Sequence, residues 1–366
     1  MGYHGGGLMD YRARQQAALG RMEAARLDAL LVVHLPNIRY LTGFSGSNAL
    51  LLLEPGRAWL YTDGRYREQA RLEVHEAKVE IPPKGDLWKA AGRRARRHKQ
   101  VGLEADHVTI AQRARWLEVW GGHEKGLRPL RGEIEALRMV KEPDEIAAIR
   151  RAVELASGGF AKLTAKLRPG MEETAAAGWL EYQLRQAGAD GLAFDTILAG
   201  GAHGAQVHAH PGSAPLPQRG FVVVDYGVQL GGYCSDMTRT VHLGEPGRKA
   251  RAVYATVLEA QMAAIAAVKP GAASAAVDRA ARRVIQKAGW GAYFPHSTGH
   301  GVGLEIHEAP RLGATSKERL AAGQVITIEP GIYIPGWGGV RIEDVVVVTE
   351  RGAEVLTPTP KQLLRL

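Results

Sequence analysis

The spacing of apolar and polar residues divides the start of the chain into short helices and strands. Apolar residues at helical spacing predict an amphipathic helix over residues 11–26, and the continuous apolar run "DALLVV" predicts a buried strand at 28–33. Two apolar runs on either side of "EPG" predict a hairpin over 48–63, and a further helix is expected over 64–73. This alternation indicates a small α/β domain.

The apolar pattern changes near residue 132, and we place a domain boundary there. The N-terminal domain then covers residues 1–132, and the second domain covers residues 133–366. The stretch "KEPDEIAAIRRAVELA" predicts a helix that begins at Pro143, because proline and acidic residues suit a first helical turn. Residues 1–9 resemble a tag remnant or an early start, and we expect them to be disordered.

The second domain contains an internal repeat. "KLRPGMEETAAAGWLEYQLRQAG" ends at Gly188 and "AVKPGAASAAVDRAARRVIQKAG" ends at Gly289, 101 residues later. Each unit predicts two helices separated by a Pro-Gly break and stopped by a glycine, and each is followed by strand-rich sequence. Two such halves should pack with approximate two-fold symmetry, with a site between their hairpins.

The first half carries two acidic residues in its hairpin, Asp225 and Asp236. A loop made of residues 230–231 would place them directly opposite each other. A loop made of residues 231–232 would make them diagonal neighbours, and two glycines there suit the positive φ angles of a tight turn. Both registers keep the two side chains on one face of the hairpin.

The second half carries a matching pair, Glu329 and Glu343, in a hairpin whose loop is centred on Gly336. An odd-length loop with that centre places the two glutamates opposite each other. Four carboxylates that converge in an apolar setting need a counter-charge, and two divalent cations would supply it. Oxygen-rich ligation favours an ion such as Mn²⁺.

A histidine ligand is available in "HSTGHGVGLEIHE", which contains His296, His300 and His307 among glycines. Any one of these acids or histidines alone would be interpreted as an ordinary turn or surface residue. Their match across a duplicated frame favours a metal centre.

The motifs of the second domain resemble those of the "pita-bread" metallopeptidases, which include methionine aminopeptidase, aminopeptidase P and prolidase. The matching stretches are "DYG" at 225–227, "SDMTRT" at 235–240, "HSTGHGVGLEIHE" at 296–308, "IEPGIY" at 328–333 and "RIEDVV" at 341–346. The resemblance implies a pseudo-two-fold catalytic domain with two divalent ions, Mn²⁺ or alternatively Co²⁺ or Zn²⁺. The ligands it implies are Asp225, Asp236, His300, Glu329 and Glu343, with Asp236 and Glu343 bridging the ions.

The N-terminal domain resembles that of aminopeptidase P and prolidase through "NIRYLTGFSGS" at 37–47 and "YTDGRYREQA" at 61–70. Methionine aminopeptidases lack this domain, and creatinases lack the metal ligands. The expected fold is therefore α/β (α+β), a small N-terminal α/β domain followed by a pita-bread domain. By the same resemblance we expect a homodimer.

The resemblance implies hydrolysis of the bond before proline by a hydroxide that bridges the two ions. We favour an aminopeptidase P, which removes the first residue of Xaa-Pro peptides, because "YLTGFSGSNALLL" resembles the short bacterial enzymes. The alternative is an Xaa-Pro dipeptidase (prolidase), in which Arg311, or Arg39 of a second subunit, would bind the substrate carboxylate. A remote alternative is a non-catalytic nucleic-acid or partner-binding protein on the same scaffold.

Five residues are candidates for direct roles in this reaction. Glu329 is the candidate proton shuttle, and His208 and His307 would donate hydrogen bonds to the tetrahedral intermediate or the leaving side. Arg341 shares a strand face with Glu343 and would orient that carboxylate or bind substrate, and Tyr333 is a candidate for substrate binding.

The stretch "GGAHGAQVHAHPGSAP" departs from the family pattern. Alignment by its Gly-Ala step places His208 at the family's histidine and His203 at the position of an asparagine, with His210 as a rival for the first role. Further candidates for the walls of a proline pocket are Phe194, Tyr233 and Trp337.

Composition limits the other classes of function. The 366-residue chain has a net charge of +9, but its densest basic stretch, "RRARRHK" at 93–99, has no nucleic-acid-binding signature beside it, so we expect no nucleic-acid partner. No apolar run reaches the roughly 18–20 residues of a membrane helix, and we expect no membrane partner. Cys234 is the single cysteine and cannot form an internal disulfide, which favours a reducing cytoplasm.

Overall fold

The computed structural model describes residues 9–121 and 124–366, so most of the N-terminal stretch expected to be disordered lies outside the described residues. The chain forms two compact units, which divide between Arg138 and Met139. The sequence pattern alone places the boundary near residue 132. The short helix α6 (Glu135–Arg138) belongs to the N-terminal unit because Arg138 Nη1 donates to Asn37 Oδ1 at 2.7 Å.

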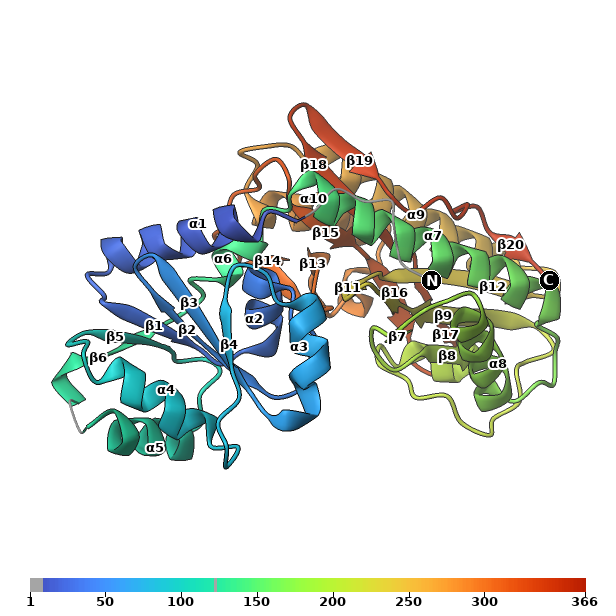
Figure 1. Cartoon of the computed structure of the whole chain (residues 1–366). Coiled ribbons are helices and arrows are strands. Elements are labelled where there is room, and N and C mark those ends of the chain that lie inside the picture. The colour runs from blue at the N-terminus through green and yellow to red at the C-terminus, as the bar shows by residue number, and fades with distance from the viewer. Residues whose placement is uncertain (1–8, 122–123) are drawn as a thin grey trace. The chain divides into compact units, whose positions relative to one another are not determined.

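The N-terminal unit is built on one six-stranded mixed sheet with the order β4-β3-β2-β1-β5-β6 (Figure 1). Its strands are β1 (Ala29–Val32), β2 (Ala49–Glu54), β3 (Arg57–Thr62), β4 (Lys78–Glu80), β5 (Val101–Glu104) and β6 (Leu127–Leu130). Its other helices are α1 (Tyr11–Ala24), α2 (Leu35–Thr42), α3 (Arg67–Glu73), α4 (Leu87–Ala95) and α5 (Ile110–Trp120), with 3₁₀ turns η1 (Gly64–Tyr66) and η2 (Glu124–Gly126).

Helices cover both faces of this sheet, which explains why its central strand reads as a continuous apolar run. All residues of β1 are buried, as expected for a strand without a solvent face. On one face, Trp116 and Trp120 of α5 are fully buried against the strands. The helix, strand and hairpin predicted in residues 11–63 are confirmed, and the helix expected over 64–73 is a 3₁₀ turn followed by α3.

The C-terminal unit contains two helix pairs that repeat one another. They are α7 (Pro143–Lys166) with α8 (Glu173–Gln186), and α9 (Arg248–Ala267) with α10 (Ser274–Lys287). The glycines at matching breaks, Gly170 and Gly271, have φ angles of 82° and 79°, and the matching stops, Gly188 and Gly289, have 103° and 84°. The predicted repeat is therefore confirmed in backbone conformation, and α7 begins at Pro143 as predicted.

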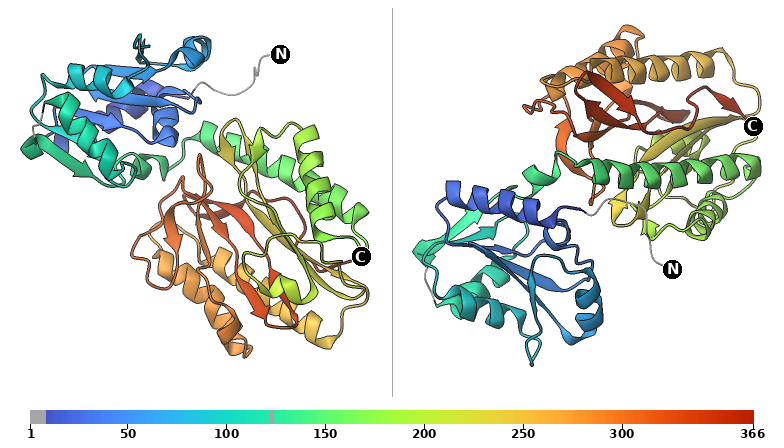
Figure 2. Two further views of the ribbon diagram at one scale, coloured as in Figure 1. Left: turned by 90° about the horizontal axis from the view of Figure 1, so that it is seen from below. Right: turned by 45° about the horizontal axis from the view of Figure 1, so that its top comes forward.

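The strands of this unit lie between α7 on one side and α9 and α10 on the other in both views of Figure 2. The strands of the first half are β7 (Gly191–Leu192), β8 (Ile197–Gly200), β9 (Gly220–Tyr226), β10 (Val228–Leu230), β11 (Tyr233–Cys234) and β12 (Met237–Leu243). Those of the second half are β13 (Gly299–Gly301), β14 (Glu308–Leu312), β15 (Val325–Ile328), β16 (Gly331–Ile334), β17 (Gly338–Arg341), β18 (Asp344–Thr349), β19 (Gly352–Val355) and β20 (Leu364–Arg365), and the 3₁₀ turns are η3 (Gly201–Ala205) and η4 (Gly291–Tyr293).

The register of the first hairpin decides between the two loops that the sequence left open. Leu230 pairs with Tyr233, so the loop consists of Gly231 and Gly232, whose φ angles of 59° and 86° suit such a turn. Asp225 stands opposite Thr238 rather than Asp236. The two aspartates are therefore diagonal neighbours, and the directly opposed register is wrong.

The second hairpin keeps one register through a break in both strands. Ile328 pairs with Asp344 before the break, and Gly331 pairs with Arg341 after it, which is the register centred on Gly336. Glu329 and Glu343 lie in the break, opposite each other as predicted. Among the described residues, no helix is both long and apolar enough to cross a membrane.

Candidate metal centre

A cavity of about 630 Å³ in the C-terminal unit brings the candidate residues of both halves together. It is lined by Phe194, Asp195, Ile197, Val207, His208, Ala209, His210, Asp225, Asp236, His296, Ser297, His300, Ile306, His307, Glu308, Arg311, Glu329, Arg341 and Glu343. All five metal ligands implied by the resemblance are among them. So are the three candidates for substrate contacts His208, His307 and Arg341.

Three of the four acids lie where a strand ladder is interrupted. Asp236 lies between β11 and β12, and Glu343 lies between β17 and β18. Glu329 follows β15 and precedes Pro330, which has no N–H to continue the ladder. A break in each hairpin thus frees the acidic residue from regular pairing and lets its side chain reach the cavity.

His300 presents one ring nitrogen to the acids. Its Nδ1 lies 2.9 Å from the carbonyl oxygen of Gly301, which can only accept, so in the neutral imidazole Nδ1 carries the proton and Nε2 has the lone pair. Nε2 lies 3.5 Å from both Asp236 Oδ2 and Glu329 Oε1. Ligand atoms that each lie 2.0–2.2 Å from one ion are about 3–3.5 Å apart, so this spacing suits a shared cation.

The electrostatics of the site favour an added positive charge. Burial raises the pKa of Asp236 well above its ordinary value, and the carboxylates of Asp225 and Glu329 raise it further. Burial also raises the pKa of Glu343, with Asp236 as the next cause, and burial raises the pKa of Glu329. The guanidinium of Arg341 contacts one of these acids, Asp225, but its single positive charge cannot neutralise four carboxylates.

Two observations show that the residues fit divalent cations. Asp225 Oδ1 is buried and has no hydrogen-bond partner, although buried carboxylate oxygens are nearly always paired. Asp236, His300 and Glu343 each offer one ligand atom, and these atoms lie within 4.8 Å of one another. Four carboxylates and one imidazole form the oxygen-rich donor set that suits Mn²⁺ and related ions.

Arg341 is held at the site by several residues. Its Nη2 donates to Asp225 Oδ2 at 2.5 Å, and its Nη1 donates to the hydroxyl of Tyr333 at 2.6 Å. That hydroxyl also lies 2.9 Å from His296 Nε2. Tyr333 does not line the cavity, so its place suits holding Arg341 rather than touching substrate. Burial lowers the pKa of His296 to about 4, which leaves its imidazole neutral.

The other histidines divide between the cavity and the scaffold. His208 and His210 both line the cavity, whereas His203 Nδ1 lies 2.8 Å from the buried carboxylate of Glu173. His203 therefore ties η3 to helix α8. The ring of His307 packs against His300 with centroids 4.5 Å apart, and desolvation by burial lowers its pKa.

The remaining pocket candidates lie in different places. Phe194 lines the cavity, but Tyr233 and Trp337 do not. The Tyr233 hydroxyl donates to Glu145 Oε1 at 2.9 Å. Cys234 is buried outside the cavity lining, and burial raises the pKa of its thiol to about 12.

A buried ion pair at the cavity wall is not among the residues that the sequence pattern singled out. Lys141 Nζ lies 2.8 Å from Glu308 Oε2, and both side chains are almost fully buried. Glu308 stands at the end of a quoted motif, next to His307, and could have been singled out there. Lys141 is too distant in sequence for any local pattern to have linked it to the site.

A second group of potential ligand atoms lies in the N-terminal unit, at His34, His107 and Glu135. The two imidazole rings stack with centroids 3.6 Å apart and an interplanar angle of 12°. Because an imidazole binds a metal through a lone pair in the ring plane, one ion cannot lie in both of these planes. The group therefore does not have the geometry of a metal site.

The comparisons with known proteins agree with this fold. The family model for metallopeptidase family M24 matches residues 147–350, and the model for the creatinase/prolidase N-terminal domain matches residues 14–140. The chain belongs to metallopeptidase family M24. The resemblance seen in the sequence and the expected architecture are confirmed.

Similar proteins match nearly the whole chain. The uncharacterized peptidase YqhT of Bacillus subtilis is 37% identical over 342 residues, which are 93% of this chain and 96% of that protein. The structure of an Xaa-Pro dipeptidase from Bacillus anthracis has a TM-score of 0.93 at 35% identity, covering 98% of this chain and 100% of that one. An X-Pro aminopeptidase from Thermotoga maritima has a TM-score of 0.88 at 34% identity, covering 94% and 100%.

Proposed function

We propose that the protein hydrolyses the peptide bond before proline and that two divalent ions, with Mn²⁺ as the first candidate and Co²⁺ or Zn²⁺ as alternatives, are its cofactors. The observation that carries the proposal is the convergence of four carboxylates and an imidazole in one cavity, with one carboxylate oxygen buried and unpaired. The residues that would hold the ions are Asp225, Asp236, His300, Glu329 and Glu343. Bound ions of this kind lower the pKa of water from 15.7 to about 7 and polarise the carbonyl of the substrate.

The chain's own residues would move protons and bind the reacting groups. Glu329 would take the proton of the attacking water and pass it to the proline nitrogen as the bond breaks. His307, with its lowered pKa, is neutral near pH 7, and its N–H would donate to the oxygen that gains negative charge. His208 lines the same cavity and would act in the same way. Arg341 would keep Asp225 oriented.

Cleavage before proline places one chemical requirement on the site. A bond before proline has no N–H, so an enzyme that cleaves it must bind the substrate without that donor. Phe194 and Ile197 offer apolar surface in the cavity where the ring would pack. Hydrolysis of Ala-Pro or Ala-Pro-Ala, but not Ala-Ala, that is lost with EDTA and restored by Mn²⁺ would support the proposal. Hydrolysis that EDTA does not affect would contradict it.

Between the two Xaa-Pro activities, we propose that the dipeptide is the better substrate. Arg311 lines the cavity from β14, and its guanidinium makes no ion pair within the described part of the chain. Such a cation suits the free carboxylate of a dipeptide. The dipeptidase from Bacillus anthracis and the prolidase from Pyrococcus horikoshii, 33% identical with a TM-score of 0.91, are similar over nearly the whole chain. The stretch "YLTGFSGSNALLL" alone had favoured the aminopeptidase.

The aminopeptidase is the second candidate, supported by the name of the Thermotoga maritima structure at 34% identity. Comparing kcat/KM for Ala-Pro and Ala-Pro-Ala separates the two. A higher value for the tripeptide would overturn the dipeptidase assignment and leave the hydrolase assignment intact.

Replacing Arg311 tests the carboxylate contact directly. In Arg311→Met we expect kcat/KM for Ala-Pro to fall about 10–100-fold, because a hydrogen bond to a charged group contributes about 1.5–3 kcal/mol. The value for Ala-Pro amide, which has no carboxylate, should change little. An equal loss on both substrates would show that Arg311 does not bind the carboxylate.

We also propose that the protein works as a homodimer in the cytoplasm. The single buried Cys234 and the resemblance to aminopeptidase P and prolidase support this. Light scattering at assay concentration would measure the assembly, and a monomeric mass would contradict it.

A further inference from the structure

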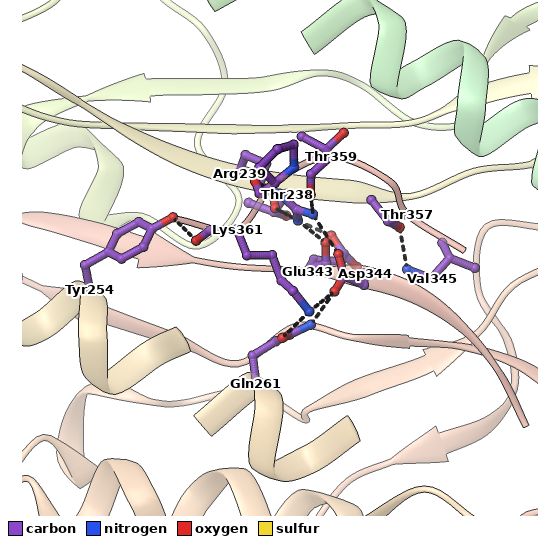
Figure 3. Close-up of polar contacts among 11 residues, drawn as sticks. Thr238, Arg239, Tyr254, Gln261, Glu343, Asp344, Val345, Thr357, Thr359 and Lys361 are labelled. Atoms are coloured by element: carbon purple, nitrogen blue, oxygen red, sulfur yellow. Dashed lines mark hydrogen bonds and ion pairs between the residues drawn. The ribbon is translucent and has the colours of Figure 1, made fainter. Parts of the chain in front are cut away.

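Glu343 lies outside regular strand pairing, so its backbone must find partners elsewhere. Its N–H donates to the carbonyl of Thr238 at 3.1 Å. Its Oε2 accepts a hydrogen bond from Thr238 Oγ1 at 2.8 Å, and its carbonyl accepts one from Arg239 Nη1. Two consecutive residues of β12, in the first half of the repeat, thus hold an acid of the second half (Figure 3).

Arg239 is almost fully buried and uses all five of its N–H groups. The acceptors are the Pro360 carbonyl (3.1 Å from Nε), the carbonyls of Thr238 (2.9 Å) and Glu343 (both from Nη1), and Asp344 Oδ1 (2.7 Å) and the Thr359 carbonyl (2.6 Å), both from Nη2. One planar group therefore joins β12, the strand break at Glu343 and the C-terminal segment.

Asp344 supplies the negative charge that pairs with the buried guanidinium of Arg239. It is fully buried, and its second oxygen accepts from Gln261 Nε2 at 2.8 Å and Lys361 Nζ at 2.7 Å. Breaking a buried charge pair leaves an uncompensated charge, so the arrangement tolerates little change. Asp344 directly follows Glu343, so fixing its carboxylate also fixes the neighbouring backbone.

We propose that Arg239 is a positioning residue for the metal centre. By fixing the backbone of Glu343, Arg239 holds the carboxylate of that residue in its ligating place before any ion binds. This inference rests on the proposed function. Lysine could not substitute, because its three N–H groups radiate from one point and cannot reach acceptors on three segments in one plane. Loss of a residue that orients a metal ligand typically weakens metal affinity by about 10–100-fold.

Mn²⁺ titration followed by the EPR signal of the free ion tests the proposal. Arg239→Lys should bind Mn²⁺ about 10–100-fold more weakly than wild type. Its activity should recover when Mn²⁺ is raised to saturation. Thr238→Val keeps the shape of the side chain but removes the hydroxyl that donates to Glu343 Oε2 and accepts from Arg341 Nε at 3.0 Å, and it should weaken binding in the same direction.

Two control variants separate positioning from general stability. Lys361→Met removes one donor to the second oxygen of Asp344 but leaves the donor from Gln261 in place. The bonds from Arg239 to Asp344 and to the Glu343 carbonyl also remain, so this variant should lower the melting temperature but weaken Mn²⁺ binding much less than Arg239→Lys does. Arg251→Lys makes the same chemical change at an exposed ion pair with Glu245, and it should change neither quantity. Equal Mn²⁺ affinity in Arg239→Lys and wild type would overturn the proposal.

Hydrogen exchange on the unmodified chain gives a test that needs no variant to fold. If Arg239 fixes the break before the ion binds, the amide of Glu343 should be as protected in EDTA as with Mn²⁺. An amide that is protected only with Mn²⁺ would overturn the proposal. If wild type binds no Mn²⁺ at all, the proposed function fails instead, so the two failures are distinguishable.

Discussion

His300 shows how one hydrogen bond decides which atom of a side chain is available for chemistry. The contact between Nδ1 and the Gly301 carbonyl leaves the Nε2 lone pair facing two acids. The sequence could identify the residue but not its tautomer, because the tautomer depends on a backbone conformation. The same holds for Asp225, whose unpaired Oδ1 is visible only in three dimensions.

The buried carboxylate of Asp236 leads us to expect an unusual dependence of the free energy of unfolding on pH. Its folded pKa is raised, so without metal its contribution is fully present below the unfolded pKa of about 3.9 and is lost as pH rises through the folded value. Asn cannot ionise. In EDTA, Asp236→Asn should therefore be more stable than wild type, and the difference should be larger at about pH 8 than at about pH 5.

Urea denaturation of both proteins at the two pH values would measure this difference. Mn²⁺ should reverse its sign at the higher pH, because the ion binds the folded wild type and stabilises it. A difference that shrinks as pH rises in EDTA would show that the acids do not repel one another in the folded protein.

At the scale of elements, the repeat and the hairpins could be predicted from local sequence patterns. The Pro-Gly breaks and the Ala-Gly stops predicted both helix pairs, and the position of Gly336 predicted the register of the second hairpin. The register of the first hairpin stayed open in the sequence, because two loops that share Gly231 were both compatible with it. The strand breaks at Glu329 and Glu343 could not be predicted, because they depend on contacts such as that of Arg239, which join distant segments.

Close backbone contact between β17 and η3 makes a prediction at this scale. A Cβ on Gly339 would lie 2.0 Å from the Gly204 carbonyl oxygen, and β17 ends at Arg341 while η3 leads to His208. Gly339→Ala should cost about 1–3 kcal/mol of stability. It should also lower kcat/KM by displacing one of these residues.

The matched control is Gly178→Ala on the exposed side of α8, where a Cβ meets nothing within 4 Å. It should stabilise the protein by about 0.5–1 kcal/mol and leave activity unchanged. Thermal unfolding and kinetics of the two variants measure both effects. Equal stability in the two variants would show that β17 and η3 can move apart at little cost to make room for the added methyl group.

At the scale of the whole molecule, the sequence anticipated two units of different construction. The N-terminal unit was readable from alternating elements, and the C-terminal unit was readable from its repeat. The boundary at Arg138 was less readable, since it depends on the bond to Asn37, whose partner lies far away in sequence. Net charge contributed little, because most of the +9 balance lies in residues 1–138, with 23 Lys and Arg against 16 Asp and Glu, whereas the acidic site lies in the C-terminal unit.

The proposed hydrolysis depends most on the acids of both halves forming one dinuclear centre. Equilibrium titration of the chelator-treated protein with Mn²⁺ measures this directly. We predict two ions per chain in wild type, and the loss of at least one of them in Asp236→Asn with the fold preserved. Binding of no ion by wild type, or the same two ions bound equally well by Asp236→Asn, would contradict the account.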